Sequence, residues 1–360
     1  MNIAVSNVDE LPQERAATGL LGLAERGYLP DVLVRHGIRR LSAQRLREET
    51  TGGLHQQAAR FTERIELLRH SPVAIHTDAA NAQHYELPPT FFALCLGQRL
   101  KYSSGFYPQG GESLEQAEEA MLELYGERGE LADGQRILEL GCGWGSLTLW
   151  MAERYPNAKI VAVSNSIQQR KYIEAQCWQR GLCNVSVITQ DVNRLDLGAE
   201  RFDRCVSVEM FEHVRNYDIL LGRIAGWLRP GGRLFVHIFA HRTLMYPFET
   251  GGEGNWMGRH FFTGGLMPAT DTLLWFQRDL KIERRWHIDG THYERTANQW
   301  LANQDVRRDQ VLSTLVSVYG SKAARLWFQR WRMFWMSCAE LFGYSNGQEW
   351  LVTHYRFVRP

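Results

Sequence analysis

The sequence has almost no net charge, no long apolar run and no paired-cysteine motif, and each absence excludes a class of protein. Its 360 residues include 41 Lys and Arg against 40 Asp and Glu, which is a formal net charge of +1. A near-neutral chain has no overall electrostatic attraction to nucleic acid, so we expect no nucleic-acid partner. No apolar stretch reaches the roughly 20 residues that cross a bilayer, so we expect no integral membrane segment.

Cysteine is present but scattered. None of the six cysteines stands in a C-x-x-C pair, which argues against a zinc site and a disulfide framework, and we expect no bound metal. The N-terminus is polar and mixed in charge, unlike a secretory signal peptide. The sequence therefore predicts a reducing, cytoplasmic setting. A homodimer and a peripheral membrane contact through the arginine-rich N-terminal helices both stay open.

The spacing of apolar residues changes at about residue 113. Before it, apolar residues at helical spacing predict helices over 11–26, 30–49, 55–69 and 89–96. After it, the expected strands span 136–140, 159–163, 185–189, 202–208 and 233–237, and the expected helices span 114–128, 147–154, 167–180 and 217–228. Such alternation predicts an α/β fold with a mostly parallel, doubly wound sheet. Residues 242–310 are expected to be irregular, 311–342 helical, and 348–358 one or two closing strands.

The most informative segment is a predicted strand that leads into a glycine loop and then a helix. The loop has the spacing G-x-G-x-G at Gly141, Gly143 and Gly145, and Glu139 stands just before it. Glycine lets a backbone approach a ligand closely, and such a loop in an α/β fold holds a nucleotide-like cofactor. Glu139 would repel a pyrophosphate and would suit a cationic ligand, such as the amino group of S-adenosyl-L-methionine (SAM).

Polar residues also follow the second and third predicted strands, whose carboxyl ends meet the loop at one edge of the sheet. Asn165 stands where a dehydrogenase carries an acid for ribose hydroxyls, and Gln169 lies one helical turn further. Asp191, beside Val192, can accept a hydrogen bond from an adenine amine; a helix cap or an Asx-turn is its competing role. With the loop spacing, these residues favour SAM over a nicotinamide dinucleotide, with S-adenosyl-L-homocysteine as product.

A cluster of ionisable residues follows the fourth predicted strand. Glu209, Glu212 and His213 form the pattern Glu-x-x-Glu-His. If the chain turns helical there, Glu209 and His213 share one face, and the competing interpretation is a surface pair worth a few tenths of a kcal/mol. Methyl transfer to an amine is an in-line displacement that needs an unprotonated nitrogen, and hence a base. The ordinary pKa of histidine, roughly 6.5, suits His213 to that role, while the carboxylates can hold the ammonium form and accept its proton.

These motifs resemble the cyclopropane-fatty-acyl-phospholipid synthase superfamily of SAM-dependent methyltransferases. The resemblance rests on the glycine loop and on residues 163–166, 190–191, 207–213 and 228–232, and from about residue 80 the chain is most similar to coclaurine N-methyltransferase-like enzymes. It implies a Rossmann-like class I methyltransferase core over 113–360, a helical cap over 1–112 and an inserted substrate lid at about 242–345. Tyr102 and Ser103 would reach from the cap to the cofactor, and the Glu-Glu-His residues would line the acceptor site.

Two methyl acceptors are consistent with this resemblance, namely a small or aromatic amine and an unsaturated acyl chain of a phospholipid. In the lipid synthases a bound bicarbonate serves as base, and Glu212, His237 and Tyr293 match its ligands. Ser104 stands in place of a cysteine of that site, and Glu209 in place of a glycine usual in lipid synthases. These two departures favour N-methylation, with cyclopropane-type transfer to a lipid as the alternative. A catalytically silent SAM-binding protein is a third interpretation.

Aromatic residues are the remaining candidates for the acceptor site. His292 and Tyr293 follow a Gly-Thr turn and can face either the pocket or the surface. Phe262 and Trp331 belong to a late aromatic group that can wall a pocket for a flat amine, and Tyr107 is a further candidate. Trp331 also has the helical spacing that ordinary core packing predicts.

Overall fold

One seven-stranded sheet organises the computed structural model, which describes residues 16–75 and 87–360. The strand order is β3-β2-β1-β4-β5-β9-β8; the first five strands are parallel, and β9 runs antiparallel to both β5 and β8. The strands are β1 (Arg136–Leu140), β2 (Lys159–Ser164), β3 (Val185–Thr189), β4 (Phe202–Val208), β5 (Leu228–His241), β8 (Lys281–Ile288) and β9 (Trp350–Val358), and a separate pair is formed by β6 (Tyr246–Pro247) and β7 (Leu266–Met267). The predicted α/β fold with a mostly parallel sheet is confirmed.

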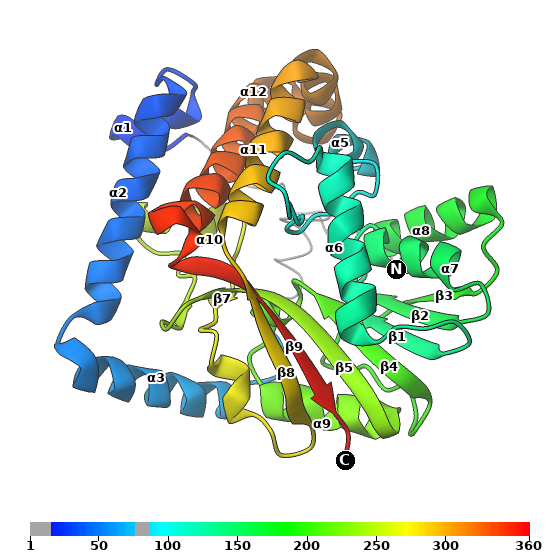
Figure 1. Cartoon of the computed structure of the whole chain (residues 1–360). Helices are drawn as coiled ribbons and strands as arrows, with labels where there is room; N and C mark the ends of the chain where they lie inside the picture. The colour runs from blue at the N-terminus through cyan, green and yellow to red at the C-terminus, as the bar shows by residue number, and fades with distance from the viewer. Residues whose placement is uncertain (1–15, 76–86) are drawn as a thin grey trace, which may run out of the picture.

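The strand order reverses beside β1, which lies between β2 and β4. Ligands of open α/β sheets bind at this point, outside the carboxyl ends of the strands. The helices that follow the strands are α6 (Leu114–Gly129), α7 (Ser146–Arg154), α8 (Ile167–Arg180) and α9 (Tyr217–Trp227). Figure 1 shows α6, α7 and α8 on one side of the sheet and α9 on the other.

Alternation along the strands gives the sheet two apolar faces, because successive side chains point to opposite sides. In β1, Ile137 belongs to a buried cluster that includes Trp150 of α7. The next residue, Leu138, belongs to a second cluster that includes Ile224 of α9. Each face of the sheet thus has its own core, and the carboxyl ends of the strands are free to carry polar groups.

Helices outside the sheet layers cover the carboxyl edge of the sheet. The N-terminal group is α1 (Gly19–Glu25), α2 (Asp31–Thr50), α3 (Gly53–His70) and α5 (Pro89–Cys95), and the later group is α10 (Trp256–His260), α11 (Thr291–Val306) and α12 (Arg308–Phe342). In Figure 1, α2 lies along α12 and α3 lies below the sheet near α9. The two groups are joined by Glu25, which is fully buried and accepts hydrogen bonds from Arg330 Nε at 3.0 Å and Trp256 Nε1 at 2.9 Å.

Most predicted elements agree with the structure to within a residue or two. Ser113 and Gln116 form a capping box at the start of α6, and Gly181 ends α8 in a left-handed conformation. The predicted helix over 11–26 is observed as α1, and its first five residues lie outside the described part of the chain. The strand expected over 233–237 extends to Leu228–His241, because β9 pairs with its second half.

One prediction about the chain after the fifth strand was wrong. Residues 242–310 were expected to be irregular, but they contain β8 and α11. The strand β8 lies at the edge of the sheet, and most of its residues are exposed or only partly buried, so it lacks the apolar run that a central strand shows. The closing segment forms one strand, β9.

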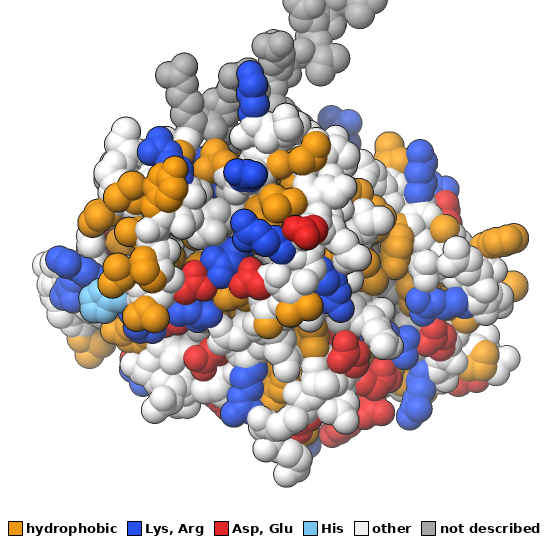
Figure 2. Space-filling model, turned by 90° about the horizontal axis from the view of Figure 1, so that it is seen from above, with side chains coloured by type: hydrophobic (Ala, Val, Ile, Leu, Met, Phe, Trp, Pro, Cys, Tyr) orange, Lys and Arg blue, Asp and Glu red, His pale blue; other side chains and the backbone are white. Residues whose placement is uncertain are grey.

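The outer surface carries charges of both signs. Figure 2 shows Lys and Arg side chains interspersed with Asp and Glu on the face seen from above, with apolar groups between them. Within residues 16–75 and 87–360, no helix combines the length and the apolar character needed to cross a membrane.

Candidate active site

A cleft opens at the carboxyl edge of the sheet, where β1 and β4 end. It holds about 1210 Å³ of empty space, part of it open to solvent, and is lined by the glycine loop, residues 100–103, the end of β4, and side chains of α11 and α12. A second hollow of about 810 Å³ lies beside it, towards the ends of β2 and β3. Gly141, Gly143, Gln169, Glu209 and His213 line both spaces, so the two hollows form one continuous site.

The glycines of the loop have different structural roles. All three have positive φ, which glycine adopts without strain. A Cβ at Gly141 would lie 2.7 Å from Met210, and one at Gly145 would lie 2.7 Å from Ile173, so both positions allow close packing. A Cβ at Gly143 would meet nothing within 4 Å and would project into open space that the cleft walls surround. Gly143 is therefore where the backbone can approach a ligand.

Glu139 and Gln169 present buried polar atoms to the cleft. Glu139 is 3 % exposed and accepts a hydrogen bond from Thr148 Oγ1, yet burial raises the pKa of its carboxyl to about 8. A cation beside it would restore its charge. Gln169 bonds to Ser164 through Oε1, and its Nε2 is buried with no partner among the described residues. Both atoms fit a polar, cationic cofactor.

The second hollow takes the polar residues that follow β2 and β3. Asn165 and Val192 line it, as does Gln190. Asp191 does not line either hollow: its Oδ1 accepts the backbone N–H of Asn193 at 2.6 Å in an Asx-turn, which is the competing role that the sequence left open. Its contact with an adenine amine stays a prediction.

Glu209 is the central residue of the cleft. It follows β4 directly with φ of 47°, a left-handed conformation that costs a non-glycine residue about 1 kcal/mol or more. Its carboxylate oxygens accept from Ser104 N at 3.2 Å and Tyr293 Oη at 2.7 Å, and Oε1 lies 3.1 Å from His237 Nε2. Burial raises the pKa of Glu209 to about 7, although the charge of Lys101 opposes the rise.

His213 and Glu212 lie on a short 3₁₀ turn, η1 (Phe211–His213), rather than on an α-helix. The expectation that Glu209 and His213 share an α-helical face was therefore wrong, although both line the cleft. The ring of His213 lies 4.5 Å from that of Phe262, and burial, helped by the charge of Arg215, lowers the pKa of His213 to about 4. The imidazole is neutral at physiological pH and a weaker base than Glu209.

Glu212 lies behind the cleft and does not line it. It is fully buried, and its Oε1 accepts the backbone N–H of Phe239 at 2.8 Å. Burial and the nearby charge of Glu209 raise the pKa of Glu212 well above its ordinary value. Its surroundings therefore favour the protonated form of the carboxyl.

Lys101 is a cleft residue for which the sequence analysis assigned no role. It is 2 % exposed, and its Nζ donates to Ser103 Oγ at 2.5 Å and to the carbonyl of Ser104 at 2.6 Å. Burial lowers the pKa of Lys101 to about 8, while the charges of Glu209 and Glu118 oppose that change. Its place directly before Tyr102 and Ser103, both of which line the cleft, is the signal that could have drawn attention to it.

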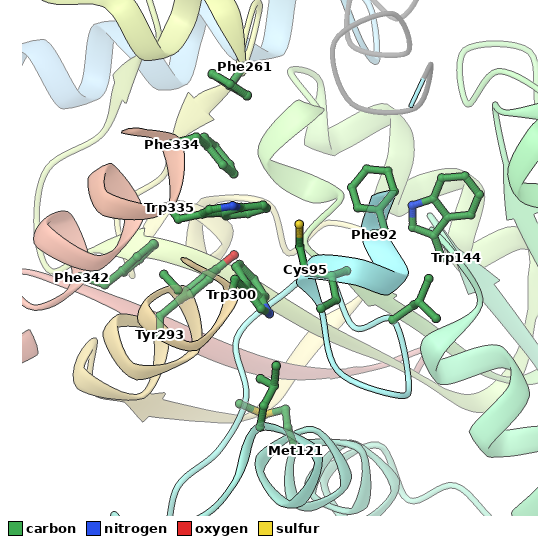
Figure 3. Packing of buried hydrophobic residues seen from close by; sticks show 14 of the residues in the cluster. Phe92, Cys95, Met121, Trp144, Phe261, Tyr293, Trp300, Phe334, Trp335 and Phe342 are labelled. Atoms are coloured by element: carbon green, nitrogen blue, oxygen red, sulfur yellow. The ribbon is translucent and has the colours of Figure 1, made fainter. Parts of the chain in front are cut away.

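The aromatic candidates divide between the cleft and the core. Phe262 and Tyr293 line the cleft, and Tyr293 stacks on Phe342 with ring centroids 4.3 Å apart, as Figure 3 shows. Trp331 has no exposed surface and packs in the core against Phe261 and Phe91. The structure does not bring Trp331 to the cleft wall.

Four further predicted substrate residues do not line the cleft, namely Ser104, Tyr107, His237 and His292. The backbone N–H of Tyr107 donates a hydrogen bond to His292 Nδ1 at 2.9 Å, so the imidazole of His292 is engaged by the backbone of Tyr107. His237 is fully buried, and it contacts two residues of the cleft wall, Glu209 and Tyr125. Their roles towards a substrate stay predictions. Among the described residues, no group of three or more His, Cys, Asp or Glu is placed to hold a metal ion.

Comparison with known proteins gives one consistent family. The profile of the mycolic acid cyclopropane synthetase family matches residues 74–350. The (S)-coclaurine N-methyltransferase of Thalictrum flavum subsp. glaucum is 34% identical over 361 residues, which cover 99% of this chain and 100% of that protein. The cyclopropane-fatty-acyl-phospholipid synthase of Escherichia coli (strain K12) is 28% identical over 77% of this chain and 67% of its own length.

A solved structure also covers nearly the whole chain. The crystal structure of a coclaurine N-methyltransferase bound to N-methylheliamine and SAH is similar with a TM-score of 0.90 and 34% identity, over 94% of this chain and 98% of that one. The similarity therefore includes the N-terminal helices as well as the sheet.

Proposed function

The chain belongs to the mycolic acid cyclopropane synthetase family as a SAM-dependent methyltransferase, and on that premise we propose that it methylates the nitrogen of a small or aromatic amine. One observation carries the choice of acceptor, namely the carboxylate of Glu209 in the middle of the cleft, held by a strained backbone and by donors on several sides. A carboxylate at this point suits an arriving ammonium group and can accept its proton.

The residues around the glycine loop fit SAM as cofactor. Gly143 would let the backbone approach it, Glu139 would bind its amino group, and Gln169 has an unsatisfied amide for it. Asn165 and Val192 would lie along its adenosine. When bound, the cofactor supplies an electrophilic methyl group at its sulfonium.

Glu209 serves as the base in the proposed reaction. Its carboxylate pairs with the substrate ammonium and accepts one proton, which exposes the nitrogen lone pair towards the methyl donor. A pKa of about 7 makes Glu209 a stronger base than an ordinary carboxylate, while leaving much of it ionised near neutral pH. His213, neutral because its pKa is lowered to about 4, can accept a hydrogen bond from the amine and so help to orient it.

The arrangement around Glu209 also disfavours the lipid alternative. Tyr293 and His237 match bicarbonate ligands of the lipid synthases, but here both contact the carboxylate of Glu209 itself, at 2.7 and 3.1 Å. The backbone N–H of Ser104 points at the same carboxylate. Two of the three side chains that match bicarbonate ligands are thus already engaged by a side chain of the protein.

A methyl-transfer screen tests the proposal. The purified enzyme with SAM is offered phenethylamine, tetrahydroisoquinoline and vesicles of an unsaturated phospholipid, and products are identified by mass spectrometry. We expect N-methylated amine and no cyclopropane lipid. Glu209→Gln should lower amine turnover by about 10²–10⁴-fold, the usual contribution of a general base, while SAM affinity changes little. Methylation of the lipid alone, or normal turnover by Glu209→Gln, would overturn the proposal.

We further propose a cytoplasmic location and keep the homodimer as a prediction. All six cysteines are free in the structure, which supports a reducing compartment. Sedimentation of the purified protein tests the oligomeric state.

A further inference from the structure

A row of side chains crosses three strands behind Glu209. In the antiparallel register His237 of β5 pairs with His354 of β9, which pairs in turn with Trp286 of β8. Both histidines have no exposed surface. Arg128 of α6 covers the outer end of the row, with its guanidinium 5.1 Å from the ring centre of Trp286.

The polar atoms of this row form a continuous chain of short contacts. Arg128 Nη1 lies 2.8 Å from His354 Nδ1, and His354 Nε2 lies 2.9 Å from His237 Nδ1. His237 Nε2 lies 3.1 Å from Glu209 Oε1. This series of contacts begins at the guanidinium of Arg128, which can only donate hydrogen bonds, and ends at the ionised carboxylate of Glu209, which can only accept them.

Each imidazole in the chain therefore has only one suitable neutral tautomer. Because Arg128 must donate, His354 accepts at Nδ1 and carries its proton on Nε2. That proton is donated to His237 Nδ1, so His237 in turn carries its proton on Nε2 and donates it to Glu209. Tyr125 Oη also lies 2.9 Å from His237 Nδ1, so its O–H competes with His354 Nε2–H for the single lone pair of that nitrogen, and either donor leaves the proton of His237 on Nε2.

We propose that Arg128 and His354 are positioning residues that fix His237 as the Nε2–H tautomer, so that the catalytic carboxylate of Glu209 always receives its hydrogen bond. This inference rests on the proposed role of Glu209 as base. The row supports the ionised form of Glu209 through direct contacts that begin at Arg128 of α6, and neither Arg128, His354 nor His237 lines the cleft.

The same geometry excludes the row as a proton exit. Outward transfer would have to end on Arg128, which is already protonated and cannot accept a proton. Burial and the charges of Lys101 and Arg128 lower the pKa of His237 well below its ordinary value. Burial also lowers the pKa of His354 well below its ordinary value, and the charges of His237 and Arg128 act in the same direction. Both shifts disfavour an imidazolium, so with Arg128 at its end the row is a poor route for the proton that Glu209 takes from the amine.

Other groups that face Glu209 set its pKa together with this row. Lys101 and the hydrogen bond from Tyr293 favour its ionised form, and His213 adds a small effect in the same direction. The remaining ionisable neighbours are Glu212, Tyr125 and Cys338. None of these groups contacts His354 Nδ1, but the ring of Tyr125 lies against that of His354 with centroids 5.5 Å apart, so a change at His354 is examined together with Tyr125.

Nitrogen-15 NMR of the histidine rings in the full-length enzyme tests the tautomers directly. We expect neutral Nε2–H signals from both His237 and His354 throughout the pH range of activity. Detection of an Nδ1–H tautomer or an imidazolium at either ring would overturn the proposal. This measurement needs no turnover, so it stays decisive even if the proposed amine substrate is wrong.

Variants at His354 test the functional consequence without changing net charge. His354→Leu removes the donor to His237, whereas His354→Gln can still accept from Arg128 and donate to His237. In the pH profile of kcat/KM for tetrahydroisoquinoline, the acid limb is the fall in rate as Glu209 becomes protonated. We expect the midpoint of this limb to move up by about one pH unit in His354→Leu, because much of a charge-assisted hydrogen bond is lost. In His354→Gln the midpoint should return towards its wild-type value. An unmoved limb in a folded variant that combines His354→Leu with Tyr125→Phe, and so removes both donors to His237 Nδ1, would refute the positioning role.

Arg128 and Arg356 offer a matched pair of substitutions. Both guanidinium groups lie over Trp286, at 5.1 and 5.9 Å, but only Arg128 contacts His354. Arg128→Met should therefore move the acid limb in the same direction as His354→Leu. Arg356→Met should lower Tm but leave the acid limb at its wild-type pH. Equal shifts in both variants would mean that lost charge, rather than the tautomer, is responsible.

Discussion

Replacing Tyr293 by Phe removes one hydrogen bond from Glu209 and leaves the packing in place. The hydroxyl lies 2.7 Å from Glu209 Oε2, and the ring stacks on Phe342 with an interplanar angle of 11°, a contact that phenylalanine retains. A hydrogen bond to a charged group contributes about 1.5–3 kcal/mol, and 1.36 kcal/mol corresponds to one pKa unit, so the pKa of Glu209 should rise by about one to two units.

The sign of the effect on rate follows from the role of Glu209 as base. The rate falls as pH drops through its pKa, which is raised to about 7 in the native enzyme. In Tyr293→Phe this limb should move to about pH 8–9, so that kcat/KM near pH 7 falls by about five- to fifty-fold and recovers at higher pH. The assay is the pH profile of kcat/KM with tetrahydroisoquinoline, whose own ionisation gives a separate, unchanged limb.

A second buried tyrosine provides the control. Tyr107 is 3 % exposed, and its hydroxyl donates to Gln299 at 2.7 Å, away from Glu209. Tyr107→Phe should leave the acid limb in place. A loss of rate in Tyr293→Phe that is equal at every pH, with no shift of the limb, would refute the assignment of Glu209 as the titrating base.

Four further substitutions probe the cofactor site and the cap. Burial raises the pKa of Glu139 to about 8 in the folded protein, so ionising this carboxyl lowers the stability of the apoenzyme as pH rises from about 4.5 to 8. Glu139→Gln should therefore raise Tm at pH 8. The same variant should bind SAM at least tenfold more weakly in calorimetry. Gly143→Ala should weaken SAM binding with only modest loss of Tm, whereas Gly145→Ala, whose Cβ meets a packed neighbour, should mainly lower Tm. Arg330→Met leaves the carboxylate of Glu25 buried and should reduce the free energy of unfolding by about 3–5 kcal/mol in denaturant titrations; a loss below 1 kcal/mol would contradict a buried ion pair.

Local patterns determined much of what the sequence analysis predicted. The strand Arg136–Leu140 and the helix Ile167–Arg180 agree with the structure because apolar period and terminal caps act over a few residues. The edge strand Lys281–Ile288 escaped detection because its exposed residues show no apolar period. The glycine loop could be identified from the sequence because glycine adopts positive φ without strain, and each of the three positions has a positive φ.

The chemistry of the acceptor site was decided by tertiary structure. The sequence placed Glu209 and His213 together and favoured the histidine as base, but the cleft buries both, lowering the pKa of His213 to about 4 and raising that of Glu209 to about 7. The pairing of His237 with His354, 117 residues apart, depends on the register of two antiparallel strands. Burial and long-range register are properties of the packed chain, because they depend on which distant segments exclude water from a side chain, and no local pattern encodes them.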